Sequence, residues 1–212
     1  MIPLEINMKK LFLSSSFKDV AQRLVAFTGE SLAGKTITFI PTASLPETVK
    51  FYVNSAKKAL QQFGLIVDEL EISTASAEDI ERKLTGNDSI YVTGGNTFYL
   101  LQELRRTGAD EIIADEINKG KLYIGESAGS IILAPNIEYA GLMDDPEVTP
   151  ELTSFDALGI IDFYPVPHHT NMPFKKAVEN IIEQYGDQLH LYPISNAEVI
   201  LVDGDIVEVA KV

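Results

Sequence analysis

The chain has 212 residues, 45% of them hydrophobic, which suits one compact domain with a sizeable core. Its formal net charge of -14, from 17 Lys and Arg against 31 Asp and Glu, argues against a phosphate-backbone partner, so we expect no nucleic-acid binding. The absence of cysteine excludes disulfides, thiolate catalysis and Cys-ligated metals, and it is compatible with a reducing cytoplasm.

The run from Met1 to Lys10 has no long apolar stretch and carries an acid ahead of its bases, unlike a secretory signal peptide. No stretch of about 18 apolar residues exists, so we expect no membrane span and no membrane partner. We therefore expect a cytoplasmic protein.

Short apolar or β-branched runs alternate with segments of helical periodicity as far as residue 134. The expected strands are 10–14, 35–41, 65–70, 88–92 and 122–124. The expected helices are 19–27, 46–63, 77–84, 97–106, 110–119 and 129–133. This alternation indicates βαβ units and a mainly parallel sheet.

Residues 135–156 lack periodicity and are rich in Pro, Asp, Glu and Thr, which predicts a long loop or lobe. A strand at 160–166 and a helix at 173–185 follow, and then strands at 189–192, 198–202 and 205–209. The Asp203-Gly204 pair predicts a hairpin between the last two strands. We predict a single α/β domain over residues 1–212, a three-layer sandwich with helices flanking a mainly parallel sheet and an antiparallel C-terminal hairpin at one edge.

The segment Gly125-Glu126-Ser127-Ala128-Gly129 joins an expected strand to an expected helix. Gly-x-Ser-x-Gly in this context is typical of a nucleophile elbow, a tight turn that presents the Ser hydroxyl at the carboxyl edge of the sheet. The N-terminus of the following helix favours developing negative charge. We interpret Ser127 as a candidate nucleophile, and the alternative is a tight turn with an incidental serine.

A serine nucleophile needs a base, and the chain has three histidines: His168, His169 and His190. The first two follow an expected strand end, where a catalytic base sits in an open α/β sheet, whereas His190 starts a strand and is interpreted as structural. An oxyanion hole needs two donors. The N–H of Ala128 and the N–H groups of residues 93–96 are candidates for them.

These segments resemble those of the peptidase E family, serine peptidases on a class I glutamine-amidotransferase-like fold that are related to cyanophycinases. The likeness rests on Val92-Thr-Gly-Gly-Asn-Thr-Phe98, the Ser127 turn, Phe155-Asp-Ala-Leu-Gly159 and Pro167-His168, which follow in the family's order. It spans about residue 10 to the end of the chain.

The resemblance implies Ser127 as nucleophile, His168 as base, and the amides of Gly95 and Ala128 as the oxyanion hole. It also implies an acid, placed between nucleophile and histidine in the sequence, that orients the imidazole. Asp144 and Asp145 match that position best, with Asp144 slightly favoured, and Glu138 and Glu147 remain alternatives.

We expect Asn96, Glu126 and His169 to bind substrate. Glu126 is charged where the family tends toward an uncharged residue, and a carboxylate there would disfavour an acidic substrate. The segment 169–176 has no arginine to bind a carboxylate and offers Lys175 or Lys176 as point charges. Whether the chain shares the N-terminal aspartate preference of the best known members is therefore an open question.

The leading hypothesis is a dipeptidase or exopeptidase that hydrolyses short peptides through an acyl-enzyme on Ser127, with no metal or organic cofactor. The resemblance implies a homodimer. The alternative is a non-catalytic member of the same fold that binds an amino acid or peptide.

A third hypothesis, nucleotide binding, rests on the segment Gly29–Thr36, which matches the Walker A pattern letter for letter. A P-loop needs a strand before it and a helix after it, and here the expected order is reversed. We interpret this segment as a Gly-rich helix-to-strand connection.

Overall fold

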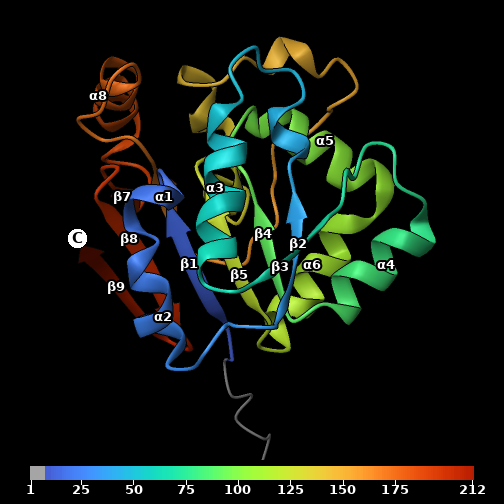
Figure 1. The fold of residues 1–212 in the computed structure, drawn as a ribbon. Coiled ribbons are helices and arrows are strands. Elements are labelled where there is room, and N and C mark those ends of the chain that lie inside the picture. The colour runs from blue at the N-terminus through green and yellow to red at the C-terminus, as the bar shows by residue number, and fades with distance from the viewer. Residues whose placement is uncertain (1–7) are drawn as a thin grey trace, which may run out of the picture.

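The computed structural model describes residues 8–212, so most of the N-terminal run that was judged unlike a signal peptide lies outside the described residues. Its main feature is a seven-stranded sheet in the order β3-β2-β4-β5-β1-β8-β9 (Figure 1). Five strands are parallel: β1 (Lys10–Ser14), β2 (Thr36–Ile40), β3 (Ile66–Glu69), β4 (Ser89–Val92) and β5 (Leu122–Glu126). The hairpin of β8 (Glu198–Asp203) and β9 (Ile206–Lys211) adds the antiparallel edge. The predicted fold class is confirmed.

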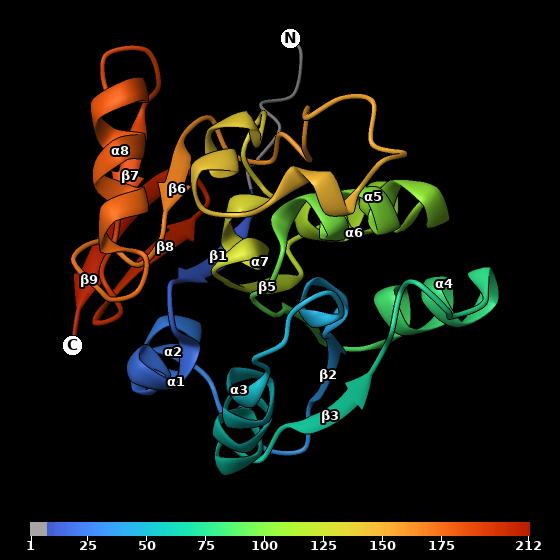
Figure 2. The ribbon, with the colours of Figure 1, turned by 90° about the horizontal axis from the view of Figure 1, so that it is seen from above.

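Alternating side chains of each central strand serve two cores. Leu11 and Leu13 of β1 pack in one core and Phe12 packs in the other, because successive side chains of a strand point to opposite faces. Helices α1 (Phe17–Val20), α2 (Gln22–Thr28) and α3 (Phe51–Gln62) cover the Phe12 face (Figure 2). Helices α4 (Ala77–Gly86), α5 (Thr97–Thr107), α6 (Ala109–Asn118), α7 (Ala128–Ile131) and α8 (Lys175–Tyr185) supply side chains to the opposite core. None of the helices in the described part of the chain is long and apolar enough to cross a bilayer.

The expected strand at 160–166 departs most from the structure. It shortens to β6 (Tyr164–Val166), which pairs with β7 (Leu191–Pro193) in a separate two-stranded sheet. Pro165 has no N–H to give to a central ladder, which fits this small edge arrangement. The expectation that this strand joins the main sheet is therefore wrong.

Residues 135–156, the expected loop, contain two short 3-10 helices at Glu138–Leu142 and Pro146–Val148. The Tyr139 side chain anchors the first of them, since its ring is 1% exposed and its hydroxyl donates to the Pro165 carbonyl at 2.6 Å. This lobe therefore packs against the domain near the carboxyl ends of the parallel strands.

Three of those parallel strands end side by side. β1 leads into Ser15, β4 into Gly94 and β5 into Ser127. Because β4 and β1 both pair with β5, these chain segments share one edge of the sheet. Open α/β sheets bind their ligands at this edge.

Candidate active site

The turn after β5 holds Ser127 in a backbone conformation that few L-residues adopt, with φ 48° and ψ -107°. Its glycines are needed for space. A Cβ on Gly125 would lie 2.5 Å from the Gly129 carbonyl oxygen, and one on Gly129 would lie 2.2 Å from the Val92 oxygen. The Ser127 amide donates to the Ser14 carbonyl at 2.8 Å, which fixes the turn against β1.

The imidazole of His168 lies next to that serine. Its Nε2 is 3.0 Å from Ser127 Oγ, while its backbone amide donates to Ser15 Oγ at 3.0 Å. The ring stacks on Phe174 with centroids 4.7 Å apart. Burial lowers the pKa of His168, although the hydrogen bond with Asn196 acts in the opposite direction. The ring is therefore neutral at pH 7 and free to accept a proton.

The third member of this chain of contacts is Asn196, which lies in the loop between β7 and β8. Its Oδ1 is 3.0 Å from Nδ1 of His168, and its own amide donates to Asn171 Oδ1 at 2.9 Å. Sequence reasoning missed this residue because it was directed at acids between Ser127 and His168. The available signal was weak: a loop asparagine at the end of a predicted strand, in a role that an amide can fill beside a histidine.

The expectation that Asp144 or Asp145 orients the imidazole is corrected by the structure. Asp144 Oδ2 accepts hydrogen bonds from the amide and hydroxyl of Thr97, at 2.9 and 2.5 Å. Those donors belong to the first turn of α5, where helix amides have no partner within the helix. Asp145 accepts from the Glu147 amide at 2.9 Å and caps a 3-10 helix. Glu138 and Glu147, the other two acids considered, are exposed.

Gly95 and Ala128, the predicted oxyanion-hole residues, both adjoin the serine turn. Gly95 has φ 135°, and a Cβ on it would lie 2.0 Å from the Ala43 carbonyl oxygen, so only glycine fits there. A Cβ on its neighbour Gly94 would lie 3.2 Å from Ser127 Cβ, which shows how closely this loop approaches the serine. Ala128 begins α7, so its amide precedes any intrahelical partner.

Two of the expected substrate-binding residues have other contacts. Asn96 lines the cavity, but its Oδ1 accepts from the Tyr99 amide at 2.9 Å and its Nδ2 donates to the Asp145 carbonyl at 2.9 Å. It therefore serves mainly as the N-cap of α5. The amide of His169 donates to the Ile194 carbonyl at 2.9 Å, and His169 is not among the residues that line the cavity.

Glu126, the third expected substrate-binding residue, is 4% exposed and turns its carboxylate inward. Its Oε1 accepts from the Phe17 amide at 2.9 Å and its Oε2 accepts from the Tyr91 hydroxyl at 2.8 Å. Burial raises its pKa to about 7, against the effect of these hydrogen bonds. Glu126 is among the residues that line the cavity over Ser127, but both of its carboxylate oxygens already accept hydrogen bonds from the protein.

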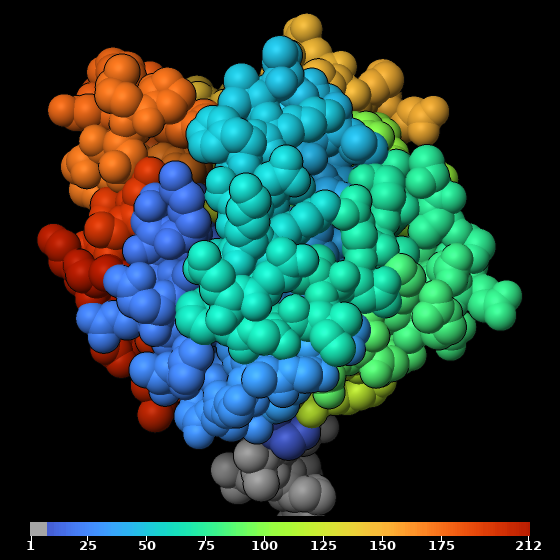
Figure 3. Space-filling view, in the orientation of Figure 1, coloured from blue at the N-terminus to red at the C-terminus, as the bar shows by residue number. Residues whose placement is uncertain are grey.

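A cavity of about 630 Å³ opens over Ser127 and is of the size that small-molecule sites have. Its walls come from segments 15–19, 46–55, 94–96, 143–148 and 172–174. In the space-filling view the orange surface of the α8 region lies beside the cyan surface of the α3 region and the blue surface of the N-terminal part of the domain (Figure 3). Within residues 8–212, Lys175 and Lys176 are not among the lining residues.

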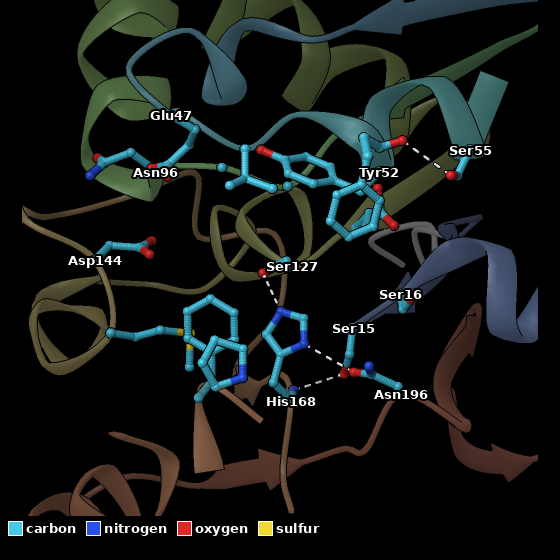
Figure 4. A pocket seen from close by; sticks show the side chains of 18 of the residues that line it. Ser15, Ser16, Glu47, Tyr52, Ser55, Asn96, Ser127, Asp144, His168 and Asn196 are labelled. Atoms are coloured by element: carbon cyan, nitrogen blue, oxygen red, sulfur yellow. Dashed lines mark hydrogen bonds between the residues drawn. The ribbon is translucent and has the colours of Figure 1, made fainter. Parts of the chain in front are cut away.

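The ionisable lining of the cavity is mainly acidic. Lys18 lies on one side, whereas Asp19, Glu47, Asp144 and Asp145 also contribute to the wall. Figure 4 shows the Asp144 carboxylate pointing into the cavity from the side opposite His168. Burial raises the pKa of Asp144 to about 6, although its hydrogen bonds with Thr97 act in the opposite direction. The cavity is therefore better suited to a cationic group than to a carboxylate.

The Walker-like segment has the geometry of a connection. Helix α2 ends at Thr28, Gly29 follows in the left-handed conformation with φ 70°, and β2 begins at Thr36. Lys35 Nζ pairs with Glu30 at 2.5 Å. Because a helix precedes the segment and a strand follows it, the predicted helix-to-strand connection is confirmed.

Comparisons with known proteins agree with this geometry. The model of peptidase family S51 matches residues 11–210. An uncharacterized peptidase of Listeria monocytogenes, Lmo0363, is 54% identical over 197 residues, covering 93% of this chain and 96% of its own. The peptidase PM1590 of Pasteurella multocida, also uncharacterized, is 53% identical over 198 residues, covering 93% and 95%. Peptidase E of a Nostoc species is 33% identical over 150 residues, which is 71% of this chain and 58% of that protein.

Solved structures show the same relationship. A crystal structure of a Listeria monocytogenes EGD-e protein, described as a candidate peptidase E, superposes with a TM-score of 0.93 at 53% identity, covering 97% of this chain and 99% of the other. A peptidase from an acI-B1 actinobacterium shares the fold at a TM-score of 0.67 and 18% identity, covering 96% and 88%.

Proposed function

Since the chain belongs to peptidase family S51 and is a serine peptidase, we propose that it is an exopeptidase that cleaves short peptides with Ser127 as nucleophile and His168 as base. The observation that carries this proposal is the 3.0 Å separation between Ser127 Oγ and His168 Nε2 inside a cavity of about 630 Å³. That distance allows direct proton transfer between hydroxyl and imidazole.

In the proposed reaction the Ser127 oxygen attacks the scissile carbonyl carbon while Nε2 of His168 takes the hydroxyl proton. The amides of Gly95 and Ala128 donate to the oxyanion that forms. The carbon–nitrogen bond then breaks, and His168 gives its proton to the leaving amine. A water molecule, deprotonated by the same imidazole, hydrolyses the acyl-enzyme and restores the serine hydroxyl.

The acidic lining supports a preference for peptides with a free amino terminus. Asp144 and Glu47 contribute carboxylates to the side of the cavity where Asn96 lies, and an α-ammonium group there would gain favourable charge interactions. An N-terminal aspartate would bring a further negative charge into the same space. We therefore place dipeptides with neutral or basic N-terminal residues ahead of Asp-X dipeptides.

One observation favours the alternative, a binding protein without catalysis. The residue at Nδ1 of His168 is Asn196, which is neutral and stabilises an imidazolium less than a carboxylate does. The two functions differ in whether Ser127 is reactive.

A fluorophosphonate probe tests that reactivity, with Ser127→Ala and His168→Ala as controls. We expect the wild type to be labelled and both variants to stay unlabelled. A panel of Xaa-Leu dipeptides with N-terminal Asp, Leu or Lys, each also as its N-acetyl form, then tests substrate choice. We expect cleavage of the free Leu and Lys peptides and little cleavage of the acetylated forms. Absence of labelling would support the binding protein, and labelling without cleavage of any dipeptide would overturn the exopeptidase.

A further inference from the structure

Glu126 is a buried acid whose surroundings the proposed reaction leaves unexplained. It is 4% exposed, directly precedes Ser127, and forms no ion pair within residues 8–212. Burying a carboxyl group without a cation is costly unless several donors satisfy it. An apolar side chain at this position would stabilise the fold at least as well as a buried carboxylate. The hydrogen-bond donors around Glu126 therefore indicate a role other than stability.

The donors come from separate parts of the site. Phe17 begins α1 and donates its amide to Oε1 at 2.9 Å, while the Tyr91 hydroxyl of β4 donates to Oε2 at 2.8 Å. The backbone of Gly94, two residues after the end of β4, lies close enough to the carboxylate to lower its pKa. One carboxylate thus joins the serine turn to α1 and to the loop after β4.

Two of those partners, Phe17 and Gly94, lie close in the chain to residues that support or take part in the proposed reaction. Phe17 lies two residues after Ser15, whose hydroxyl accepts the backbone amide of His168 at 3.0 Å. Gly94 precedes Gly95, a proposed oxyanion donor. The carboxylate therefore connects the segments that determine the relative positions of the nucleophile, the base and the oxyanion donor.

The Tyr91 hydroxyl is itself held in place. Its ring stacks on Phe39 with centroids 5.0 Å apart and meets Phe17 edge-on at 5.2 Å. The ring is fully buried, so its hydroxyl cannot turn toward solvent. This rigid donor keeps the Glu126 side chain in one orientation.

We propose that Glu126 is a positioning residue, whose ionised carboxylate holds the Ser127 turn in register with the Ser15–Phe17 segment and the Gly94–Gly95 loop. This inference rests on the proposed function. The ionised form accepts charge-assisted hydrogen bonds at both oxygens, whereas a protonated carboxyl accepts more weakly and can keep the Tyr91 contact by reversing its direction.

Protonation of Glu126 therefore weakens the contacts that hold the Ser127 turn against the Ser15–Phe17 segment and the Gly94–Gly95 loop. Its pKa is raised to about 7, chiefly by burial, so the change falls within an ordinary assay range. The other titratable groups that affect or adjoin it are Asp19 of α1, which raises its pKa, Tyr91 of β4, which lowers it, Tyr52 of α3, and His168 beyond the serine. Activity that depends on ionised Glu126 should fall as the pH drops through about 7.

Two variants should shift the acid limb of the pH profile, the range in which activity falls toward low pH, in opposite directions. Glu126→Gln removes the ionisation, so the acid limb should move lower, to the limb set by His168, with a plateau about tenfold below wild type. Tyr91→Phe keeps the ring packing but removes a donor that lowers the pKa of Glu126, so the limb should move upward. Glu103→Gln alters a buried acid of α5 paired with Arg106 and should leave the limb in place.

The readout is the rate of Ser127 labelling by a fluorophosphonate from pH 5 to 9, which requires no knowledge of the peptide substrate. Amide NMR of Phe17, Gly94 and Gly95 over the same range separates positioning from catalysis. We expect these amides to shift with a step near the Glu126 pKa in wild type and without that step in Glu126→Gln. Wild type without labelling but with the amide step would overturn the proposed function alone. Absence of the amide step, or an acid limb unmoved by both variants, would overturn the role of Glu126.

Discussion

The side-chain amide oxygen of Asn196 lies 3.0 Å from Nδ1 of His168, while Nε2 of the same ring faces Ser127 Oγ at 3.0 Å. Because an amide oxygen can only accept, this contact assigns the ring proton to Nδ1 and leaves the lone pair of Nε2 toward the hydroxyl. The arrangement selects the tautomer needed for a base. It supplies orientation without the negative charge that a carboxylate would add.

Replacing Asn196 by alanine should therefore slow the reaction without abolishing it. The imidazole loses its only contact at Nδ1 within the described residues and samples the wrong tautomer and ring orientation. We expect kcat to fall by roughly 10- to 100-fold with KM little changed, less than the loss of a triad carboxylate causes. Steady-state kinetics on a cleaved dipeptide measure this, and an unchanged kcat would contradict the assignment.

The substitution Asn196→Asp should change the pH profile instead. A carboxylate beside Nδ1 favours the imidazolium, so the pKa of His168 rises from its lowered value. In the Glu126→Gln background, where His168 sets the acid limb, that limb of kcat/KM then moves to higher pH, because less of the imidazole is neutral at a given pH. A limb that stays in place or moves to lower pH would show that Asn196 does not face the base.

Asp144 should prove dispensable for reactivity and important for binding. It bonds to Thr97 at the start of α5 and points into the cavity, whereas Nδ1 of His168 contacts Asn196. In Asp144→Asn we expect fluorophosphonate labelling within about threefold of wild type, whereas KM for free-amine dipeptides rises several-fold. Labelling of Asp144→Asn that is as low as that of His168→Ala would instead support a catalytic role for Asp144.

Gly95 tests the loop that faces the serine. In Gly95→Ala the new Cβ would meet the Ala43 carbonyl at 2.0 Å and the residue would keep a φ of 135°. We expect a loss of about 3 kcal/mol or more in unfolding free energy, together with loss of labelling. Gly86→Ala is the matched control, since nothing lies within 4 Å of its Cβ and it ends a helix. Urea melts of both variants decide this, and equal stability would contradict the clash.

Stability should fall as pH rises, because two carboxyls have raised pKa values in the folded state. Glu126 is raised to about 7 and Asp144 to about 6, so the folded chain binds protons that the unfolded chain has released. Their contribution to the unfolding free energy is full below their unfolded pKa values and is lost as pH rises through the folded ones. His168, whose pKa is lowered, acts in the opposite sense. Between pH 5 and 8 we expect a net loss on the order of 2 kcal/mol.

The double variant Glu126→Gln plus Asp144→Asn is the control for this pH effect. With both carboxyls removed, urea melts should give an unfolding free energy that is flat or rises slightly across the interval. Equal slopes in wild type and double variant would show that other groups carry the dependence.

Much of the fold was predictable because its signals are local. The strand at Lys10–Ser14 and the hairpin between the last two strands follow from short-range hydrophobic and glycine patterns, and the structure has both, with the two turn residues at Gly204 and Asp205. The start of α3 was not predictable at the same level. Periodicity suggested residue 46, but the helix begins at Phe51. Residues that resemble a helix turn in composition form an irregular wall of the cavity instead.

The site was predictable where backbone geometry dictates residue type, and less so where tertiary contacts decide. Gly125 and Gly129 indicate a tight turn, so Ser127 could be identified from the five-residue segment alone. The partner of His168 depends on where a loop some 30 residues later returns, and no local pattern encodes that. The sequence suggested that Glu126 contacts substrate because it adjoins Ser127. Its hydrogen bonds with Phe17 and Tyr91 could not be predicted, because those residues lie in other elements.

The position of β8 beside β1 bears on how the protein is made. β1 precedes its antiparallel neighbour β8 by most of the domain, so it leaves the ribosome well before β8 does. Asn196 lies two residues before β8, so a nascent chain that ends before it holds the hydroxyl and the imidazole without the group that sets the tautomer. Docking of the hairpin of β8 and β9 thus completes the assembly of the hydrolase, and full reactivity waits until this part of the chain has been made.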